Sequence, residues 1–390
     1  MSLSRWLGTA CVLLTLAGCE TIGGFFDDDD YDPTQPVELV DIDESVGLKK
    51  RWSRSIGDGQ GDGFYRLNPV LADGIIYAAS ADGEIAAFDA QSGRERWSVE
   101  LDLPISGGVG KYRDALFVGG ADGLVIKLSA GDGSELWRTT VSGEVLAAPQ
   151  ADGNVVVAQA YDGKLMGFDF ETGEKLWTYT NDVPVLTLRG TSTPIIYNDI
   201  AIAAFADGKV IAVALASGSV VWEARVAIAQ GRSEIERIVD IDGTMATQGA
   251  ELYVASYQGR IVALEMRAGR KLWQRNVSAV SGVSVGFGNV YVADEDGTVS
   301  AFLRNGQGVR WQNIDLGYRE LSRPTPVSSY VAVTDFEGYL HLLSQVDGVI
   351  VGRARPDSDG ARADMIASGN VLYVYGNSGD LVAYDVEAGN

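Results

Sequence analysis

The amino-acid sequence predicts an all-β fold, an eight-bladed β-propeller of four-stranded antiparallel blades. Three observations support this prediction: a repeat that recurs eight times, a tryptophan at a fixed place in the repeat, and a half-unit at each end of the chain. The composition agrees, because 48 glycines against 10 prolines in 390 residues indicate many tight turns.

The repeat begins with a glycine turn, usually Asp-Gly, and continues with a short apolar strand, a small turn and a strand that carries tryptophan. The first copy runs from Asp82-Gly83 to Trp97, fourteen residues beyond the glycine. Glycine tolerates the positive φ angles of a two-residue hairpin turn, and aspartate tolerates them better than most residues. Four short strands at a period of about 40 residues are typical of propeller blades. The eight copies begin at Gly83, Gly123, Gly163, Gly208, Gly259, Gly297, Gly338 and Gly379.

The two ends of the chain supply the halves of one blade. The copy at Gly379 ends at Asn390, before its tryptophan strand, whereas the segment from Lys49 to Trp52 is a tryptophan strand without a blade. Pairing of these segments closes the ring and hides sheet edges that would invite aggregation. We therefore expect an N-terminal strand to complete the last blade, within a propeller that extends over residues 48–390.

Seven of the eight tryptophans occupy the same place in the repeat, and the eighth, Trp6, lies in the N-terminal segment. A blade must cover both faces of its sheet by stacking on its neighbours. A large aromatic side chain at a repeated position suits this contact. The repeat tryptophans are thus predicted to be packing wedges between blades and not a cofactor site.

The first 18 residues are typical of a lipoprotein signal peptide. Arg5 precedes an apolar run that ends at Ala17 and is too short to span a bilayer as a mature helix. The segment Leu16-Ala17-Gly18-Cys19 is similar to a bacterial lipobox, in which cleavage leaves a diacylated cysteine at the new N-terminus. Cys19 is therefore the predicted lipidation site, and a secretory signal with a chance cysteine is the alternative. By analogy with Gram-negative lipoproteins, Glu20 favours a lipid anchor in the inner leaflet of the outer membrane, facing the periplasm.

Residues 19–47 are predicted to form a lipidated, acidic and flexible tether. The segment contains four consecutive aspartates, Asp27–Asp30, and a run of like charges is usually a solvated spacer. Over the whole chain, 31 basic and 53 acidic residues give a formal net charge of −22. This charge repels phosphate backbones, so nucleic acid is not an expected partner.

Residue types that enzymes and metal sites commonly use are scarce. Cys11 lies within the predicted signal and Cys19 is expected to carry lipid, so no thiol remains for catalysis or a disulfide. The single histidine, His341, lies in an apolar strand, where a packing or surface role is expected, and it cannot form a multi-histidine zinc site. The segment Gly57–Gly63 matches neither an EF-hand nor a P-loop and is expected to be a mobile loop. No metal, cofactor or catalytic residue is predicted.

Two long connections mark the candidate binding surface. The copies at Gly163, Gly208 and Gly259 are separated by 45 and 51 residues, against about 40 elsewhere. Both excesses follow a tryptophan strand, so the loops should emerge on one face from neighbouring blades and lie side by side. Function on a propeller lies in its loops, because the blades supply a rigid frame. The candidate partner-binding residues in these loops are Leu186, Leu188, Arg189, Asp240 and Asp242.

The mixture of apolar and charged residues in these loops suits a protein partner, because apolar anchors supply affinity and charged groups set the register. An ion pair between Arg189 and one of the aspartates, which would only pin the loops together, is the alternative. The loops contain no aromatic residue, which disfavours a carbohydrate- or peptidoglycan-binding propeller.

The repeat resembles the tryptophan-docking motif of quinoprotein dehydrogenases, which raises the alternative of an enzyme that binds pyrroloquinoline quinone. In that family, catalysis uses a calcium or lanthanide ion held by acidic and amide side chains, an aspartate base, and often a disulfide of adjacent cysteines. The disulfide is impossible here, and the inner segments Leu146–Gln150 and Val280–Val285 are uncharged. A dehydrogenase is thus the less favoured interpretation.

The segments Leu186-Thr187-Leu188-Arg189-Gly190 and Glu234–Asp242 resemble those of the BamB family, the propeller lipoproteins of the β-barrel assembly machinery. The resemblance extends over the lipobox, the acidic spacer and the eight blades, with Gly352 in place of one tryptophan as a departure. It implies a non-enzymatic scaffold that binds the periplasmic POTRA domains of BamA within the assembly complex, with nascent outer-membrane proteins as further candidate partners. In that family the positions matching the five candidate residues support binding to BamA.

Overall fold

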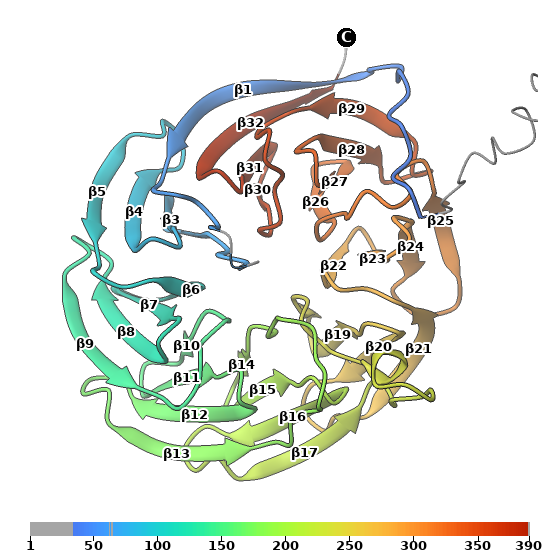
Figure 1. Ribbon diagram of the computed structural model, residues 1–390. Coiled ribbons are helices and arrows are strands. Elements are labelled where there is room, and N and C mark those ends of the chain that lie inside the picture. The colour runs from blue at the N-terminus through green and yellow to red at the C-terminus, as the bar shows by residue number, and fades with distance from the viewer. Residues whose placement is uncertain (1–33, 62, 64, 389–390) are drawn as a thin grey trace, which may run out of the picture. The chain divides into compact units, whose positions relative to one another are not determined.

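The computed structural model describes residues 34–61, 63 and 65–388. The predicted signal peptide, Cys19 and most of the predicted tether therefore lie outside the described residues. From Pro36 onward the chain forms one compact unit, in which eight four-stranded antiparallel sheets surround a central axis (Figure 1). The predicted all-β eight-bladed propeller is confirmed. Within the described residues, no helix has the length and apolar character that a membrane crossing needs.

The blades are numbered I to VIII in chain order, and each begins with the strand closest to the axis (Figure 1). The strands of blades I and II are β2 (Val70–Ala72), β3 (Ile75–Ala79), β4 (Glu84–Asp89), β5 (Glu95–Glu100), β6 (Ile105–Tyr112), β7 (Ala115–Gly120), β8 (Leu124–Ser129) and β9 (Glu135–Thr140). The strands of blades III and IV are β10 (Gln150–Ala151), β11 (Val155–Gln159), β12 (Lys164–Asp169), β13 (Lys175–Thr180), β14 (Ile195–Tyr197), β15 (Ile200–Ala204), β16 (Lys209–Ala214) and β17 (Val220–Arg225).

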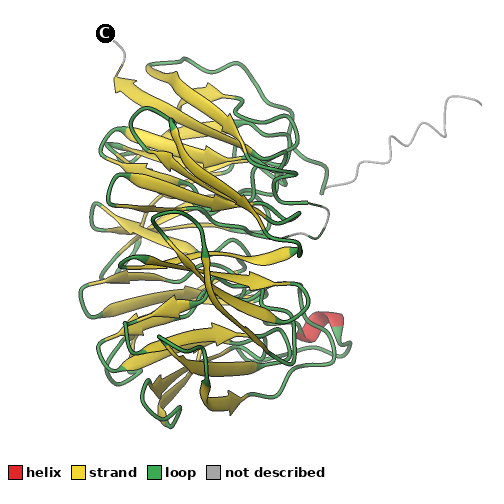
Figure 2. Cartoon of the chain, turned by 90° about the vertical axis from the view of Figure 1, so that its left-hand side faces the viewer, coloured by secondary structure: helices red, strands yellow, loops and turns green. Residues whose placement is uncertain are grey.

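The remaining blades follow the same order, with one exception in blade VIII. The strands of blades V and VI are β18 (Ala246–Gln248), β19 (Glu251–Ala255), β20 (Gly259–Glu265), β21 (Lys271–Val277), β22 (Val283–Gly286), β23 (Asn289–Ala293), β24 (Val299–Leu303) and β25 (Val309–Asn313). Those of blades VII and VIII are β26 (Thr325–Val327), β27 (Tyr330–Thr334), β28 (Leu340–Ser344), β29 (Ile350–Ala354), β30 (Ile366–Ser368), β31 (Val371–Tyr375), β32 (Asp380–Ala388) and, from the other end of the chain, β1 (Val46–Ser55). Among the described residues there is a single 3-10 helix, η1 (Ile235–Arg237), and it projects from one face (Figure 2).

The tryptophans connect seven of the eight blades to the next, as predicted. Trp222 of blade IV is 8% exposed, and its Nε1 donates a hydrogen bond of 2.9 Å to the carbonyl oxygen of Met266 in blade V. Its indole lies on Gly269, where an added Cβ would come within 2.4 Å of the ring. All seven repeat tryptophans donate in this way to the following blade, at 2.6 to 3.1 Å, and they are Trp52, Trp97, Trp137, Trp177, Trp222, Trp273 and Trp311.

Blade VII lacks a tryptophan for a geometrical reason. The tryptophan of each other blade packs on a glycine turn between the third and fourth strands of the next blade. Blade VIII has no such turn, because its third strand, β32, and its fourth strand, β1, come from opposite ends of the chain. Gly352 instead lies close to β1, and a Cβ added there would come within 2.7 Å of the carbonyl oxygen of Val46.

The predicted closure is confirmed by the pairing of β1 with β32, which runs from Val46 opposite Ala388 to Ser55 opposite Asp380. An ion pair between Arg51 and Asp385 adds a side-chain contact across this ladder. The pairing completes blade VIII, so every sheet of the ring has four strands.

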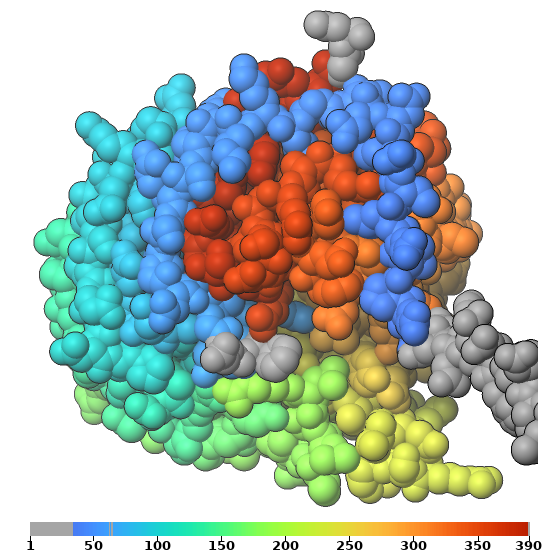
Figure 3. Space-filling view, turned by 45° about the horizontal axis from the view of Figure 1, so that its top comes forward, coloured from blue at the N-terminus to red at the C-terminus, as the bar shows by residue number. Residues whose placement is uncertain are grey.

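Residues 37–45, which we call the strap, differ from the expected flexible spacer. Val37 donates its N–H to the carbonyl oxygen of Gly317 at 3.0 Å, and Ser45 donates to that of Val351 at 3.0 Å. Leu39 and Ile42 pack against the hydrophobic core beside blades VI and VII. The N-terminal segment thus crosses the orange and red blades (Figure 3). These few apolar side chains are hard to recognise within an acidic stretch, which explains why composition predicted a longer tether.

A buried charge cluster, formed by Arg319, Asp335 and His341, lies beneath the strap. Asp335 Oδ2 accepts hydrogen bonds from Arg319 Nε at 2.7 Å and from His341 Nε2 at 3.1 Å. Burial raises the pKa of Asp335, but the hydrogen bonds from His341 and Arg319 outweigh burial and hold the pKa below its usual value. Arg319 Nη1 also donates to the carbonyl oxygen of Val37 at 2.9 Å. Of the predicted packing or surface role for His341, the surface alternative is wrong, because the side chain is completely buried as part of this cluster. The cluster fastens the strap through Arg319.

Candidate partner-binding site

The two long connections lie side by side on one face, as predicted. We call residues 181–194, between β13 and β14, the Leu-Arg loop, and residues 226–245, between β17 and β18, the Asp loop. Ser192 Oγ of the first donates to the carbonyl oxygen of Gly243 in the second at 2.9 Å, and Leu188 donates its N–H to the carboxylate of Asp240. The connections therefore form one continuous surface.

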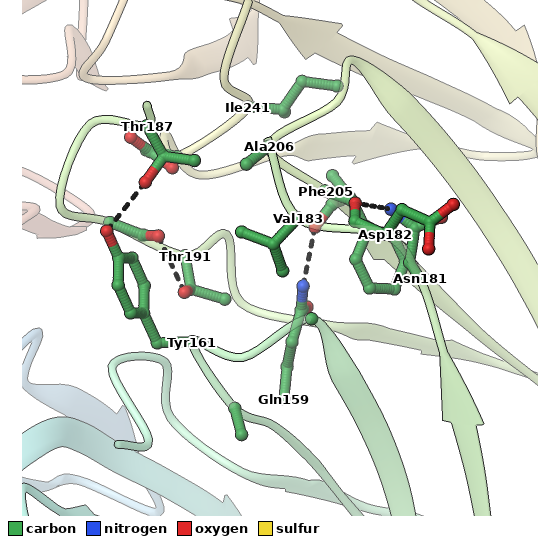
Figure 4. A pocket seen from close by; sticks show the side chains of 15 residues that line it. Gln159, Tyr161, Asn181, Asp182, Val183, Thr187, Thr191, Phe205, Ala206 and Ile241 are labelled. Carbon is green, nitrogen blue, oxygen red and sulfur yellow. Dashed lines mark hydrogen bonds between the residues drawn. The ribbon is translucent and has the colours of Figure 1, made fainter. Parts of the chain in front are cut away.

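The Leu-Arg loop has a fixed base and an exposed apolar tip. Tyr161, in the turn between β11 and β12 of blade III, shares a hydrogen bond of 2.7 Å with Thr187, and this contact holds the base of the loop (Figure 4). Val185 is 84% exposed and Leu186 is 43% exposed, whereas Leu188 is half-buried. Such a tip presents apolar surface to a partner without a large loss of loop entropy on binding.

Arg189 is held by residues that the sequence did not identify. Its Nη2 lies 2.8 Å from both carboxylate oxygens of Glu144, and its guanidinium lies 5.5 Å from the ring centre of Tyr65. The alternative of an Arg189 ion pair with Asp240 or Asp242 is therefore wrong. Glu144 precedes the inner strand of blade III and Tyr65 precedes that of blade I, and no local motif connects them to the Leu-Arg loop.

Asp240 and Asp242 lie beneath the exposed parts of the two loops. Asp240 is 1% exposed and accepts the N–H of Leu188, so it positions the Leu-Arg loop and does not itself face a partner. Burial, with a contribution from the charge of Asp242, raises the pKa of Asp240 to about 8. Burial raises the pKa of Asp242 to about 7, and the nearby charge of Arg66 opposes this shift.

The tip of the Asp loop is a small rigid projection (Figures 2 and 3). The carboxylate of Glu236 accepts the backbone N–H groups of Arg232 at 2.6 Å and Ser233 at 3.3 Å. These hydrogen bonds lower the pKa of Glu236 and fix the turn that contains η1. Ile235 stands 66% exposed at this tip, so the Asp loop also offers an apolar contact to a partner.

A pocket of about 230 Å³ opens between the two loops and the axis. We call it the Asp242 pocket, because Asp242 lines it together with Tyr65, Arg66, Leu188 and Tyr257. Arg66 crosses toward the opposite side of the ring, where its Nη1 donates to the carbonyl oxygen of Val280 at 2.9 Å. Among residues 34–61, 63 and 65–388, no cluster of three or more His, Cys, Asp or Glu side chains could hold a metal ion.

Asp240→Asn is expected to flatten the dependence of stability on pH. The folded pKa of Asp240 lies above its ordinary value, so between about pH 4 and pH 8 the folded protein holds a proton that the unfolded chain has released. Stability from this site therefore falls as the pH rises through that range. Asparagine keeps an acceptor for Leu188 and has no charge, so we expect the variant to gain about 4 kcal/mol over wild type on going from pH 5 to pH 8.5.

Urea denaturation at a series of pH values measures this difference. The exposed Asp102→Asn variant removes the same formal charge and should follow the wild-type profile. Parallel profiles for wild type and Asp240→Asn would show that Asp240 is ionised normally in the folded protein.

Comparison with known proteins identifies the family. The family described as outer membrane protein assembly factor BamB matches residues 81–313. The protein of that name from Pseudomonas aeruginosa is 47% identical over 384 residues, covering 98% of this chain and 99% of its own. The one from Shewanella oneidensis is 35% identical over 362 residues, covering 89% and 91% of the two chains.

Solved structures agree with these relatives. The crystal structure of BamB from Moraxella catarrhalis has a TM-score of 0.80 at 27% identity and covers 87% of this chain and all of its own. Quinohemoprotein alcohol dehydrogenase from Comamonas testosteroni has a TM-score of 0.69 at 14% identity, with 90% and 78% of the two chains covered, and this likeness shows a shared fold alone. The chain belongs to the BamB family of outer membrane protein assembly factors.

Proposed function

We propose that the protein is a non-enzymatic scaffold subunit of the outer-membrane protein assembly complex, and that its Leu-Arg and Asp loops bind the POTRA domains of BamA. The observation that carries this proposal is the convergence of the two irregular loops into one surface with a rigid support. The names of the relatives, outer membrane protein assembly factor, agree with a role in assembly.

The chemistry of the two loops suits a protein partner. Val185, Leu186 and Ile235 offer exposed apolar contacts, and Arg189 adds a positive charge that Glu144 holds in place. Apolar anchors supply most of the affinity of such interfaces, while charged groups at the margin select the register. Asp240 contributes indirectly, because it fixes the backbone of Leu188.

The N-terminal segment completes the proposed function. Cleavage before Cys19 and lipidation of its thiol would attach the propeller to the inner leaflet of the outer membrane on the periplasmic side. The strap then joins the anchored segment to blades VI and VII, away from the two loops on blades III to V. This arrangement leaves the loops accessible to BamA, and nascent outer-membrane proteins are further candidate partners.

Affinity of the full mature chain for the BamA periplasmic domain tests the proposed site. We expect Leu188→Ala and Arg189→Ala each to raise Kd by about tenfold or more, because they remove a half-buried anchor and an oriented charge. Bio-layer interferometry measures the change, and circular dichroism confirms that the variants are folded.

Two residues of the outer strand β9 provide matched controls. Leu136 is 53% exposed, and Arg138 forms an exposed ion pair with Glu135 much as Arg189 does with Glu144. Leu136→Ala and Arg138→Ala should bind BamA like wild type. If folded Leu188→Ala and Arg189→Ala variants also bind like wild type, the loops are not the binding site.

A further inference from the structure

A basic surface lies on the neighbouring blades V and VI, on the face opposite the Leu-Arg and Asp loops (Figures 1 and 2). The loops connect a fourth strand to the next first strand, so the turns from third to fourth strand within each blade lie on the opposite face. We call this surface the basic corner. Its six cationic residues come from these turns and from the outer strands β21 and β25, and they are Arg267, Arg270, Lys271, Arg275, Arg304 and Arg310.

Contacts between the two blades bring these cations together. Trp273 Nε1 of blade V donates to the carbonyl oxygen of Arg304 in blade VI at 2.8 Å, and Arg275 donates to the carbonyl oxygen of Gly306. The backbone N–H of Arg304 donates to the carbonyl oxygen of Gly288 at 3.0 Å, which adds the turn between β22 and β23. Two turns of blade VI and the outer strand of blade V therefore form one surface.

The basic corner is positively charged, although the whole chain has a formal net charge of −22. Only two carboxylates, Glu251 and Glu265, lie near its six cations in the sequence of blades V and VI, because Asp294–Asp296 occupy a turn on the opposite face. Among the described residues, four exposed cations of the corner have no ion-pair partner, and they are Arg267, Arg270, Lys271 and Arg310. Charges beyond about 10 Å are screened, so the local sign decides what approaches the corner.

Phe287 adds an exposed aromatic ring beside these cations. It is 68% exposed and follows β22 with a φ of 51°, in the left-handed region that non-glycine residues rarely adopt. The residue at this place in six other blades is polar or glycine, and these residues are Asp73, Arg113, Asn198, Gly249, Ser328 and Gly369. The turn itself therefore does not require phenylalanine, and the ring is available to an apolar partner.

We propose that the basic corner binds the anionic headgroups of a phospholipid membrane and that Phe287 inserts at the boundary between headgroups and acyl chains. Arginine and lysine side chains are attracted to an anionic leaflet, and an exposed aromatic ring suits its interfacial zone. The six cations outnumber the exposed apolar side chains of the corner, Leu272, Phe287 and Val309. Protein interfaces instead have an apolar centre depleted of charge, so the composition favours a lipid surface over an acidic protein.

This inference goes beyond the proposed function and agrees with the proposed anchor. Thr34 follows Cys19 by 15 positions, and a chain of this length reaches at most about 50 Å. The strap meets blade VI at Gly317, so a lipid on Cys19 can enter a membrane that lies against the same blade. The Leu-Arg and Asp loops on the opposite face would then point away from the membrane, toward a periplasmic partner.

Binding to phospholipid vesicles tests the inference. The full mature chain with Cys19→Ser has no lipid of its own, so its binding reports on the protein surface. We expect it to sediment several-fold more with vesicles that contain about 30% phosphatidylglycerol than with pure phosphatidylcholine vesicles, and to dissociate in about 0.5 M salt. Arg270→Gln/Lys271→Gln should weaken binding about tenfold or more, and Phe287→Ser, with the residue type of Ser328 in blade VII, should weaken it several-fold.

A matched double variant separates the basic corner from the total charge. Lys49 and Lys50 are an exposed basic pair on β1, at the same distance before Trp52 as Arg270 and Lys271 are before Trp273. Lys49→Gln/Lys50→Gln should bind vesicles like the parent chain. Equal losses for the two double variants, or equal binding to neutral and anionic vesicles, would overturn the inference. A folded parent chain that binds neither vesicle would also overturn it and would indicate an acidic protein as the partner of the corner.

A fluorophore in place of Phe287 measures insertion directly. The mature Cys19→Ser chain has no cysteine, because Cys11 lies in the predicted signal peptide. A polarity-sensitive dye on Phe287→Cys should shift its emission to the blue with anionic vesicles, whereas the dye on Asp73→Cys, in the equivalent turn of blade I, should not. Equal shifts at the two turns would contradict insertion at the basic corner. These measurements do not involve BamA, so their failure would leave the proposed function standing.

Discussion

Replacement of Arg319 by leucine is expected to lower the free energy of unfolding by about 3–5 kcal/mol, because it leaves a buried carboxylate without its ion-pair partner. Asp335 is 1% exposed, and Arg319 Nε donates to it at 2.7 Å. The same substitution removes the hydrogen bond from Arg319 to the carbonyl oxygen of Val37 and so loosens the strap. Urea denaturation measures the loss, and hydrogen exchange at residues 37–45 reports on the strap.

Two comparisons separate the ion pair from the loss of a large side chain. Arg51→Leu breaks the partly exposed pair with Asp385 and should cost about 1 kcal/mol or less. Addition of Asp335→Asn to Arg319→Leu removes the unpaired charge, so the double variant should be more stable than Arg319→Leu alone. A double variant that is less stable would contradict this account of the buried charge cluster.

Trp222→Ala is expected to cost about 3–5 kcal/mol, the range for removal of a buried large aromatic side chain. The indole fills the contact between blades IV and V, and the alanine would leave a cavity above Gly269. The carbonyl oxygen of Met266 would also lose its 2.9 Å hydrogen bond. The midpoint and slope of urea denaturation give the loss in stability.

Neighbouring residues offer graded controls for this wedge. Trp222→Phe keeps much of the volume but not the indole N–H, so it should cost clearly less than Trp222→Ala. Trp273 is only partly buried, so Trp273→Ala should have a smaller effect than Trp222→Ala. Exposed Leu272→Ala should change stability by less than about 0.5 kcal/mol. Equal losses of stability for Trp222→Ala and Leu272→Ala would show that Trp222 does not stabilise the contact between blades IV and V.

The fold could be predicted because the residues that specify a blade recur at regular intervals along the sequence. The Asp-Gly turns and tryptophans recur at a nearly constant spacing, and each set of four strands repeats the same local chemistry. Even the closure was predictable, since a strand without a blade at one end matched a blade without a strand at the other. The adjacency of the two long loops followed from the same regularity.

The contacts within the site could not be predicted, because they join residues with no common motif. Arg189 pairs with Glu144 from the connection before blade III, and Tyr65 comes from the segment that enters blade I. The sequence predicted that the five candidate residues lie on one face, and they do. It did not predict their exposure: Leu186 and Arg189 face solvent, whereas Asp240 is buried. Burial depends on how neighbouring loops cover a residue, and the spacing of residues along the sequence does not predict that cover.

Closure by β1 and β32 has a consequence for biosynthesis. The paired Arg51 and Asp385 are separated by 334 residues, so the last blade cannot form while the chain is still emerging. Contacts at this separation form late and slowly, because a long loop must close before they contribute stability. A chain that lacks β32 would leave β1 and β31 with open edges, which invite aggregation or degradation. Because β1 needs β32 to complete the last blade, only a chain synthesised through β32 can fold into a stable ring.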